Sequence, residues 1–314
     1  MASGREMKKI FALAFGVSAC WASASYELAF VADNAVSGLS SGRILRFDTV
    51  SGAYLGSFGD SYSGYTDITV SPSRSRLYGL SSGTLLEMNY STGVTLRAAL
   101  TGGTGTIQMS PGESEIWLQN GKTISRYSPV TLGLLGSFNL ATSQTVSSMT
   151  VVGSEIYALL STGTTRSIAK FNSSGALLST STNTLNLASV GKIGHQVSEG
   201  SSLIISFGSP DNANMYYSFS SNGGPLQFLG SYGPLSTTKI VDVTPLHVGG
   251  AALSQTSSGQ QVLTITTSSG GAFKQIGAGI IGNGVAVTTI VAPEPATMIA
   301  LGAGLSVFLR KRRA

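Results

Sequence analysis

Short runs in which apolar and polar residues alternate fill the middle of this chain of 314 residues, and Gly, Ser and Asn turns separate them. A two-residue alternation is typical of β-strands. No stretch repeats apolar residues with the period of about 3.6 that marks an amphipathic helix. The pattern therefore predicts an all-β domain, which we place at residues 25–291.

One alternating segment recurs along this domain. Residues 44–58 read Ile-Leu-Arg-Phe-Asp-Thr-Val-Ser-Gly-Ala-Tyr-Leu-Gly-Ser-Phe, which is two strands joined by a polar turn. The Gly in the turn supplies the positive φ that a β-hairpin needs. The same pattern returns at residues 85–93, 124–138 and 168–178, with weaker copies around residues 217–219 and 263–265.

A second kind of hairpin precedes the first. It spans residues 67–80 and 106–118, where Ser-Pro starts the turn because Pro presets φ, and residues 148–159, where the Pro is missing. One aromatic residue stands at the matching position of each copy, and we expect all three to lie in the core: Tyr78, Trp117 and Tyr157.

Two hairpins repeated about every 40 residues are typical of the four-stranded blade of a β-propeller. Counting hairpins predicts six blades; seven blades, a pair of β-sandwiches and a solenoid are the alternatives. Residues 26–31 read as a second strand without a first, and residues 284–290 read as a first strand with no blade after it. We therefore expect the two terminal strands to complete one blade, which would close the array and leave no unpaired end.

Residues 40–180 resemble the YVTN-type β-propeller repeat, in which a strand, a Ser-Pro turn and an aromatic-bearing strand recur. The later copies depart from that pattern. The resemblance implies a propeller fold for the body of the chain.

The N-terminus reads as an export signal. Lys8 and Lys9 precede an apolar stretch at residues 10–19, and Ala22-Ser23-Ala24 fits the A-x-A cleavage rule. Residues 1–24 are therefore predicted to be a signal peptide removed by signal peptidase after passage through the general secretion machinery.

A rival reading of this segment involves Cys20. Residues 17–20, Val-Ser-Ala-Cys, resemble a lipobox, in which Cys20 would carry lipid. Cys20 is the only cysteine of the chain. Cleavage after Ala24 would therefore leave a mature protein without a disulfide or a thiolate.

The C-terminus has three parts in a fixed order, which we assign to residues 292–314. A Pro-Glu-Pro element comes first, an uncharged stretch at residues 296–309 follows, and a basic end closes the chain. As a helix the stretch would span roughly 21 Å, which local thinning and snorkelling bring closer to the ~30 Å membrane core. A C-terminal hydrophobic helix is thus expected, flanked by the residues Pro293, Glu294, Pro295, Arg310, Lys311, Arg312 and Arg313.

These three parts resemble the PEP-CTERM sorting signal of exported bacterial proteins. The resemblance implies that a membrane-embedded exosortase cuts the chain near Pro293-Glu294-Pro295, so that the inner-membrane anchor is transient. It also implies a cell-surface or extracellular-matrix location, and an association with exopolysaccharide and biofilm matrix. An ordinary, permanent C-terminal anchor is the alternative.

Charge does not point to nucleic acid. The formal net charge is +5, but the basic excess belongs to the two terminal segments. Residues 25–293 hold 12 basic and 12 acidic residues. A neutral body lacks the positive footprint that phosphate backbones require, so no nucleic-acid partner is expected.

Few residues suggest chemistry. Asp67 and Asp242 fall at similar places on first strands, where two carboxylates in a propeller channel could hold a cation. The alternative is that each meets backbone N–H groups of a neighbouring strand. His195 and His247 read as structural residues, and residues 210–214 lack the Gly and distal Glu of a calcium loop.

No nucleophile elbow, metalloprotease motif or phosphate loop occurs in the sequence, so no catalytic residue, metal or cofactor is predicted. We expect an exported, non-catalytic propeller of the cell surface or exopolysaccharide matrix. The alternatives are a hydrolase or lyase acting on polysaccharide or lactone, with its site around Asp67, Asp242 and His195, and a solute-binding propeller.

Overall fold

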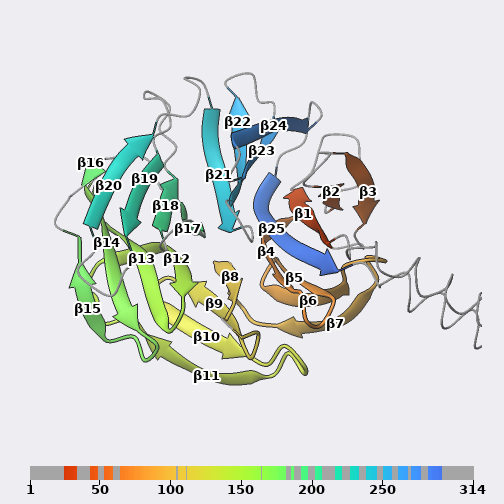
Figure 1. Cartoon of the computed structure of the whole chain (residues 1–314). Coiled ribbons are helices and arrows are strands. Elements are labelled where there is room, and N and C mark those ends of the chain that lie inside the picture. Colours follow the sequence, from red (N-terminus) through yellow and green to blue (C-terminus); the bar gives the residue numbers. More distant parts are fainter. Residues whose placement is uncertain are drawn as a thin grey trace, which may run out of the picture. The chain divides into compact units, whose positions relative to one another are not determined.

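Every regular element described in the computed structural model is a β-strand (Figure 1). Side chains are described chiefly between residues 28 and 181 and at Ile193. The structure describes residues 25–33, 43–48, 53–58, 64–103, 105–110, 112–163, 165–181, 185–186, 192–196, 202–206, 216–220, 227–232, 238–245, 250–256, 261–267, 270–276 and 282–291.

The described strands form six sheets, in which consecutive strands are antiparallel. The chain divides into a large unit, residues 28–288, and a small one of residues 1–27 and 289–314. The sheets belong to the large unit, apart from the ends of β1 and β25. The first three sheets along the chain are β25 (Gly282–Val291), β1 (Ser25–Asp33), β2 (Arg43–Asp48), β3 (Tyr54–Phe58); β4 (Tyr65–Ser71), β5 (Arg76–Ser81), β6 (Thr84–Asn89), β7 (Thr95–Leu100); and β8 (Thr106–Met109), β9 (Ile116–Asn120), β10 (Thr123–Tyr127), β11 (Leu134–Asn139).

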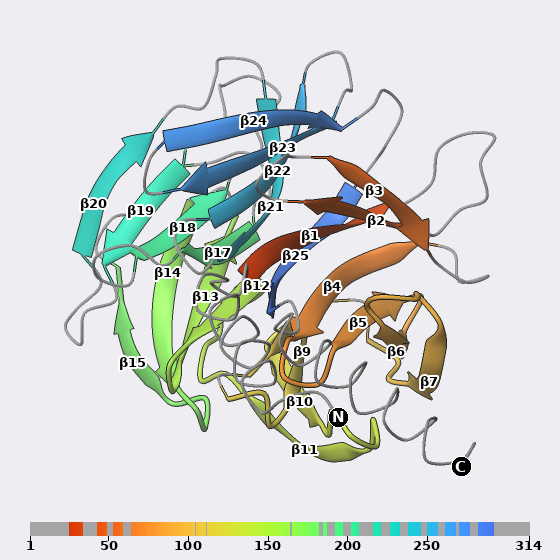
Figure 2. The same ribbon diagram turned by 45° about the vertical axis from the view of Figure 1, so that its right-hand side comes forward.

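The remaining three sheets repeat this order, and Figure 2 shows their strands lying side by side. They are β12 (Thr145–Val152), β13 (Glu155–Thr162), β14 (Thr165–Asn172), β15 (Leu177–Thr180), with β16 (Leu185–Asn186) also paired to β14; β17 (Lys192–Gln196), β18 (Ser202–Ser206), β19 (Tyr216–Ser220), β20 (Gln227–Tyr232); and β21 (Thr238–Pro245), β22 (Gly250–Thr256), β23 (Gln261–Thr267), β24 (Gly270–Ile276).

Strand order agrees with the hairpins expected from the sequence. Each of the last five sheets consists of strands that are consecutive in the chain, four in each and with β16 as a fifth in the β12–β15 sheet, whereas the first sheet has the order β25-β1-β2-β3. The first and last described strands of the chain therefore lie in one sheet, with β25 in the first position and β1 in the second, as the sequence predicts.

A β-bulge recurs at one place in the repeat. In five sheets the register between the third and fourth strands shifts by one residue directly before an apolar side chain. A bulge adds local twist to the strand pair, so its recurrence shows that the sheets share one local geometry. The shifts fall between Arg46 and Phe47, Glu87 and Met88, Arg126 and Tyr127, Lys170 and Phe171, and Ser218 and Phe219.

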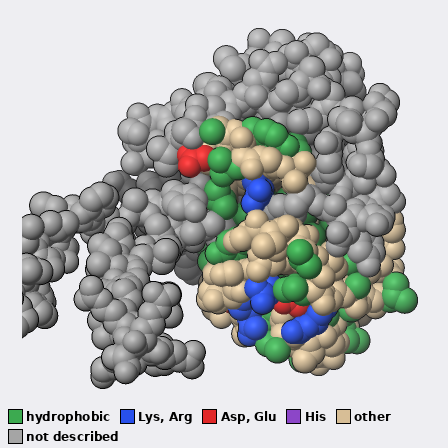
Figure 3. Space-filling view, turned by 90° about the vertical axis from the view of Figure 1, so that its right-hand side faces the viewer, with side chains coloured by type: hydrophobic (Ala, Val, Ile, Leu, Met, Phe, Trp, Pro, Cys, Tyr) green, Lys and Arg blue, Asp and Glu red, His purple; other side chains and the backbone are tan. Residues whose placement is uncertain are grey.

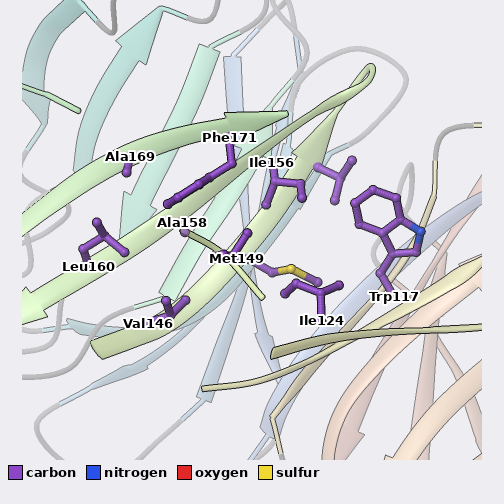
Figure 4. Packing of buried hydrophobic residues seen from close by; sticks show 11 residues of the cluster. Trp117, Ile124, Val146, Met149, Ile156, Ala158, Leu160, Ala169 and Phe171 are labelled. Carbon is purple, nitrogen blue, oxygen red and sulfur yellow. The ribbon is translucent and has the colours of Figure 1, made fainter. Parts of the chain in front are cut away.

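The core lies between neighbouring sheets. Side chains of the β8–β11 sheet pack against the β12–β15 sheet in one cluster, to which Trp117, Met149 and Phe171 belong (Figure 4). A second cluster joins the β4–β7 and β8–β11 sheets through Tyr78 and Ile107. Tyr78, Trp117 and Tyr157 are all buried, which confirms their expected place in the core.

Several expected features fall outside the described residues. They are the signal segment with Ala22, Ala24 and Cys20, the C-terminal residues 292–314, His247, and residues 210–214. Across the ranges that the structure describes, no helix is long and apolar enough to cross a bilayer.

Candidate functional site

Asp67 joins two sheets by accepting backbone hydrogen bonds. Its Oδ2 accepts from the N–H of Ile107 on β8 at 2.9 Å, and its Oδ1 accepts from the N–H of Ile68 at 3.0 Å. The residue is only 6 % exposed. Ser148 holds the matching place on β12, and its Oγ accepts a hydrogen bond from the N–H of Ile193 on β17 at 3.3 Å.

A second set of bonds lies two residues further along the same strands. Thr69 Oγ1 accepts from the N–H of Met109 at 3.0 Å. Gln108 accepts from the N–H of Val151 at 2.9 Å and donates to the Val151 carbonyl at 3.3 Å. First strands have no neighbouring strand on one side, so these side chains satisfy backbone groups that burial would otherwise leave unpaired. We call this arrangement the inter-sheet latch.

Asp67 and Asp242 hold corresponding positions on two different sheets. Asp67 pairs with Leu80 and Asp242 pairs with Leu253, in each case directly after a register shift in the strand. The side chain of Asp242 lies outside the described part. In that part, no group of three or more His, Cys, Asp or Glu side chains is placed to hold a metal ion.

His195 lies on β17, where its backbone pairs with Leu203 of β18. Its side chain, like that of Asp242, is outside the described part, and Asp67 is the one member of this predicted set whose side chain the structure describes.

Ion pairs flank the core aromatic residue in successive sheets. Glu115 and Arg126 lie 3.5 Å apart, and the Trp117 Nε1–H donates to Glu115 at 2.8 Å. In the next sheet Glu155 and Lys170 lie 2.7 Å apart. The carboxylate thus stands at the start of the second strand, directly before β9 for Glu115 and as the first residue of β13 for Glu155, and the cation lies on the third strand.

Glu155 illustrates how such a pair is balanced. Burial acts to raise the pKa of its carboxyl, but hydrogen bonds from Lys170 and from the Tyr157 hydroxyl at 2.7 Å outweigh that effect. The pKa of Glu155 therefore lies below its usual value. The group contributes stability as the carboxylate.

The β4–β7 sheet reverses the signs of this pair. Arg76 takes the second-strand position and Glu87 the third, with Arg76 Nε donating to Glu87 Oε1 at 3.1 Å. Arg97 of β7 adds a second cation, its Nε 3.5 Å from Glu87 Oε2. The Glu87 side chain is 5 % exposed, against 30 % for Arg76 and 47 % for Arg97. A buried carboxylate is thus paired with one half-buried arginine, Arg76, and one exposed arginine, Arg97.

The pKa of Tyr78 is affected by the charges of Glu87 and of the neighbouring arginines. Burial, followed by the nearby Glu87 carboxylate, raises the pKa of Tyr78 to about 12, while Arg74, Arg76 and Arg97 each act to lower it. Its hydroxyl donates to the Pro129 carbonyl at 2.9 Å. The charges of three arginines therefore act on one phenol, and we call Arg74, Arg76 and Arg97 with Glu87 the arginine cluster.

Two members of the arginine cluster depart from the repeat. In three other sheets the third strand carries one cation, and the fourth-strand residue that pairs with it is small. These pairs are Arg46 with Gly56, Arg126 with Gly136 and Lys170 with Ser179. At Gly136, where φ is +155°, an added Cβ would lie 3.3 Å from Arg126 Nη2. Arg97 takes this place opposite Glu87.

Arg74 is the other departure. It stands in the turn after Ser71-Pro72, where the following sheet has Glu113 after Ser110-Pro111. Glu113 is bound to the Ser71 hydroxyl and to the Ser73 backbone and hydroxyl, and forms no ion pair with any described residue. Figure 3 shows basic side chains gathered around acidic atoms on the face that it presents. Our sequence reasoning missed this cluster, although comparing aligned repeat positions would have marked Arg74 and Arg97.

The fourth strands expose apolar side chains. Pairs stand near their starts, as Tyr54-Leu55 on β3, Leu134-Leu135 on β11 and Leu177-Leu178 on β15, with exposures from 44 to 61 %. These strands end their sheets, and edge strands with exposed apolar residues favour association.

Solved structures resemble this chain in fold. A protein of unknown function from Bacteroides caccae shares 9 % identity at a TM-score of 0.60, covering 84 % of this chain and 99 % of its own. The β-propeller domain of Cps50 (Swd1) from Myceliophteria thermophila shares 9 % identity at 0.51, covering 82 % of each chain. A Bacteroides uniformis protein provisionally described as a 6-phosphogluconolactonase shares 12 % identity at 0.50, covering 80 % of this chain and 82 % of its own.

The fold is that of a β-propeller. At such identities the likeness reaches the fold alone and carries no activity from one protein to another. No protein-family profile matches the chain, and no curated protein does.

Proposed function

We propose that this chain is an exported, non-catalytic propeller that is sorted to the cell surface or exopolysaccharide matrix. The observation that carries the proposal is the sequence of the tail, in which three parts follow one another: Pro293-Glu294-Pro295, an uncharged stretch at residues 296–309 and the basic residues 310–313. An export signal at residues 1–24 supports it, because a membrane-embedded sorting enzyme can reach only a chain that enters the secretion pathway.

The body then serves as a rigid display scaffold. We propose that its six described sheets are six blades, and that β25 and β1 close the array by sharing a blade. The shared sheet and the inter-sheet bonds of Asp67 and Ser148 support this, because both remove unpaired strand edges. A closed array would remain folded after both terminal segments are cut away.

The proposed route has two cuts. Signal peptidase cleaves after Ala24, and residues 296–309 then hold the chain in the inner membrane with the basic end in the cytoplasm. An exosortase then cuts near Pro293-Glu294-Pro295 and releases the propeller. The proposal thus makes the anchor temporary.

Cell fractionation tests this route. The full-length chain is expressed in a Gram-negative host with and without an exosortase, alongside a variant carrying Pro293→Ala and Pro295→Ala. The matched control replaces Ala292 and Ala296, which flank the element, with Ser. The wild type and the control should reach the surface fraction only when the exosortase is present, and the Pro variant should stay in the inner membrane. Equal release of the Pro variant, or a wild type that stays in the cytoplasm, would refute the proposal.

A further inference from the structure

The arginine cluster presents more positive charge than its own sheet neutralises. Arg76 and Arg97 both pair with the single carboxylate of Glu87, and Arg74 stands two residues before Arg76, whereas the matching positions of the next two sheets hold one-to-one pairs. This is a local departure in a body whose basic and acidic residues are equal in number. Such breaks in an otherwise consistent repeat are where functional sites are expected.

The cluster has donors that no described residue uses, and two of its three arginines, Arg74 and Arg97, are exposed. Arg74 is exposed and, among the described residues, makes no hydrogen bond or ion pair. Among the described residues, Arg97 contacts only Glu87, through its Nε, and both Nη groups have no partner there. Within the described ranges, Arg76 donates from Nε to Glu87 and from Nη1 to the Ser75 carbonyl, and its Nη2 has no partner.

Glu87 holds two of these groups in position. Its Oε1 receives the Arg76 hydrogen bond, whereas its buried Oε2 lies 3.5 Å from Arg97 Nε and receives no hydrogen bond within the described part. A buried carboxylate fixes the stems of the two arginines without capping their outer ends. This pre-organisation lowers the entropy lost when the arginines bind an anion.

We propose that the arginine cluster binds a carboxylated polysaccharide, a polymer with one uronate group on each sugar, and this rests on the proposed location of the protein in a polysaccharide matrix. Planar guanidinium groups match carboxylates in bidentate geometry. A polymer of uronates would offer one carboxylate to Arg97 and another to Arg74 at the same time. Multivalent contact of this kind raises avidity without new chemistry.

Nucleic acid is the less favoured polyanion. A protein that binds duplex DNA commonly makes about 6–10 phosphate contacts and presents a basic stripe. The cluster offers three arginines, and residues 25–293 carry as many acidic as basic groups. A few contacts to a carboxylated sugar polymer suit that modest charge better.

Binding of the full-length protein to sodium alginate, a polyuronate, tests the proposal, with neutral dextran and duplex DNA as the other probes. Affinity is measured at about 0.01 M and about 1 M salt, where the Debye length falls from about 30 Å to about 3 Å. We expect binding to alginate at low salt, none at high salt, and none to dextran. Failure to bind alginate at low salt, or DNA binding as tight as alginate binding, would overturn the proposal.

Variants locate the binding. R74Q and R97Q each remove one charge and leave the Arg76–Glu87 pair intact, and K122Q removes an exposed charge from the β9–β10 turn as the matched control. The double variant R74Q/R97Q should weaken alginate binding at least tenfold, and K122Q less than twofold. Equal losses in R74Q and K122Q would mean that only overall charge matters and would overturn the site.

Thermal unfolding separates this role from a structural one. If Arg97 serves only to neutralise Glu87, R97Q will lower the unfolding temperature and leave alginate binding unchanged, and this result would also overturn the site. The assay is independent of sorting. Release at the surface without alginate binding would sink this inference alone, and alginate binding by a chain that never leaves the cytoplasm would sink the proposed location alone.

Discussion

Replacing Asp67 with Ala should weaken the junction between two sheets. The change removes the acceptor of the Ile107 N–H at 2.9 Å and of the Ile68 N–H at 3.0 Å, at a residue only 6 % exposed. A hydrogen bond to a charged group contributes about 1.5–3 kcal/mol, and a buried donor left unpaired costs a similar amount. Because the Ile68 bond is local, we assign most of the loss to Ile107 and expect a destabilisation of about 2–4 kcal/mol.

The assay is thermal unfolding of the full-length chain, followed by circular dichroism at neutral pH. For a domain of this size each kcal/mol shifts the midpoint by about 2–4 °C, so the midpoint of the Asp67→Ala variant should fall by about 5–15 °C. Asp67→Asn keeps a carbonyl acceptor and loses the charge, so its shift should be about half as large. Lys122→Gln, on an exposed turn, should leave the midpoint unchanged.

An unchanged midpoint for Asp67→Ala would refute the latch. Added calcium distinguishes this role from the alternative in which Asp67 helps to hold a cation. If Asp67 helped to hold a cation, calcium would raise the midpoint of the wild type and not that of Asp67→Ala. The latch predicts no difference between the two proteins in their response to calcium.

Other sites give further predictions, each checked by urea unfolding. The pKa of Glu155 is lowered in the folded state, so its pair with Lys170 stabilises the fold above the unfolded pKa of about 4.3 and loses that effect as pH falls through the folded pKa. The difference in unfolding free energy between wild type and Glu155→Gln should therefore shrink in acid. A difference that stays constant with pH would contradict this role of the pair. Gly136→Ala should cost about 1–3 kcal/mol, because φ is +155° and the new Cβ would crowd Arg126; a neutral effect would show that the strand adjusts. Phe171→Ala should cost about 3–5 kcal/mol from the cavity that it opens between two sheets, and a loss below 1 kcal/mol would contradict that packing.

Local signals predicted the hairpins well. Alternation and Gly turns lie within a few residues of the strands that they define, so residues 44–58 became β2 and β3, and residues 67–80 became β4 and β5. The weaker copies near residues 217–219 and 263–265 also fall on third strands, β19 and β23. Their turns carry less distinctive residues, but the alternation was enough.

Contacts between sheets could not be predicted in the same way. The bond from Ile107 to Asp67 joins residues 40 positions apart, and its partner depends on how two sheets pack. The sequence did place Asp67 and Asp242 at matching positions, and the registers agree with this. It left open whether such a carboxylate meets a cation or a backbone N–H.

The arginine cluster was missed for a related reason. Arg97 comes opposite Glu87 only because the bulge shifts the register at the next residue, Met88. Hydropathy also misleads at the outer strands. Leu134 and Leu135 have the composition of a buried strand, yet they are 61 % and 52 % exposed because β11 is the last strand of its sheet.

Intact mass of the surface-associated protein tests the central claim most directly. The account predicts a species that begins at Ser25 and ends near Pro293-Glu294-Pro295, with the propeller whole between the two cuts. A surface species that still carries Arg310 to Arg313 would contradict it, because the anchor would then be permanent and the tail would not be a sorting signal.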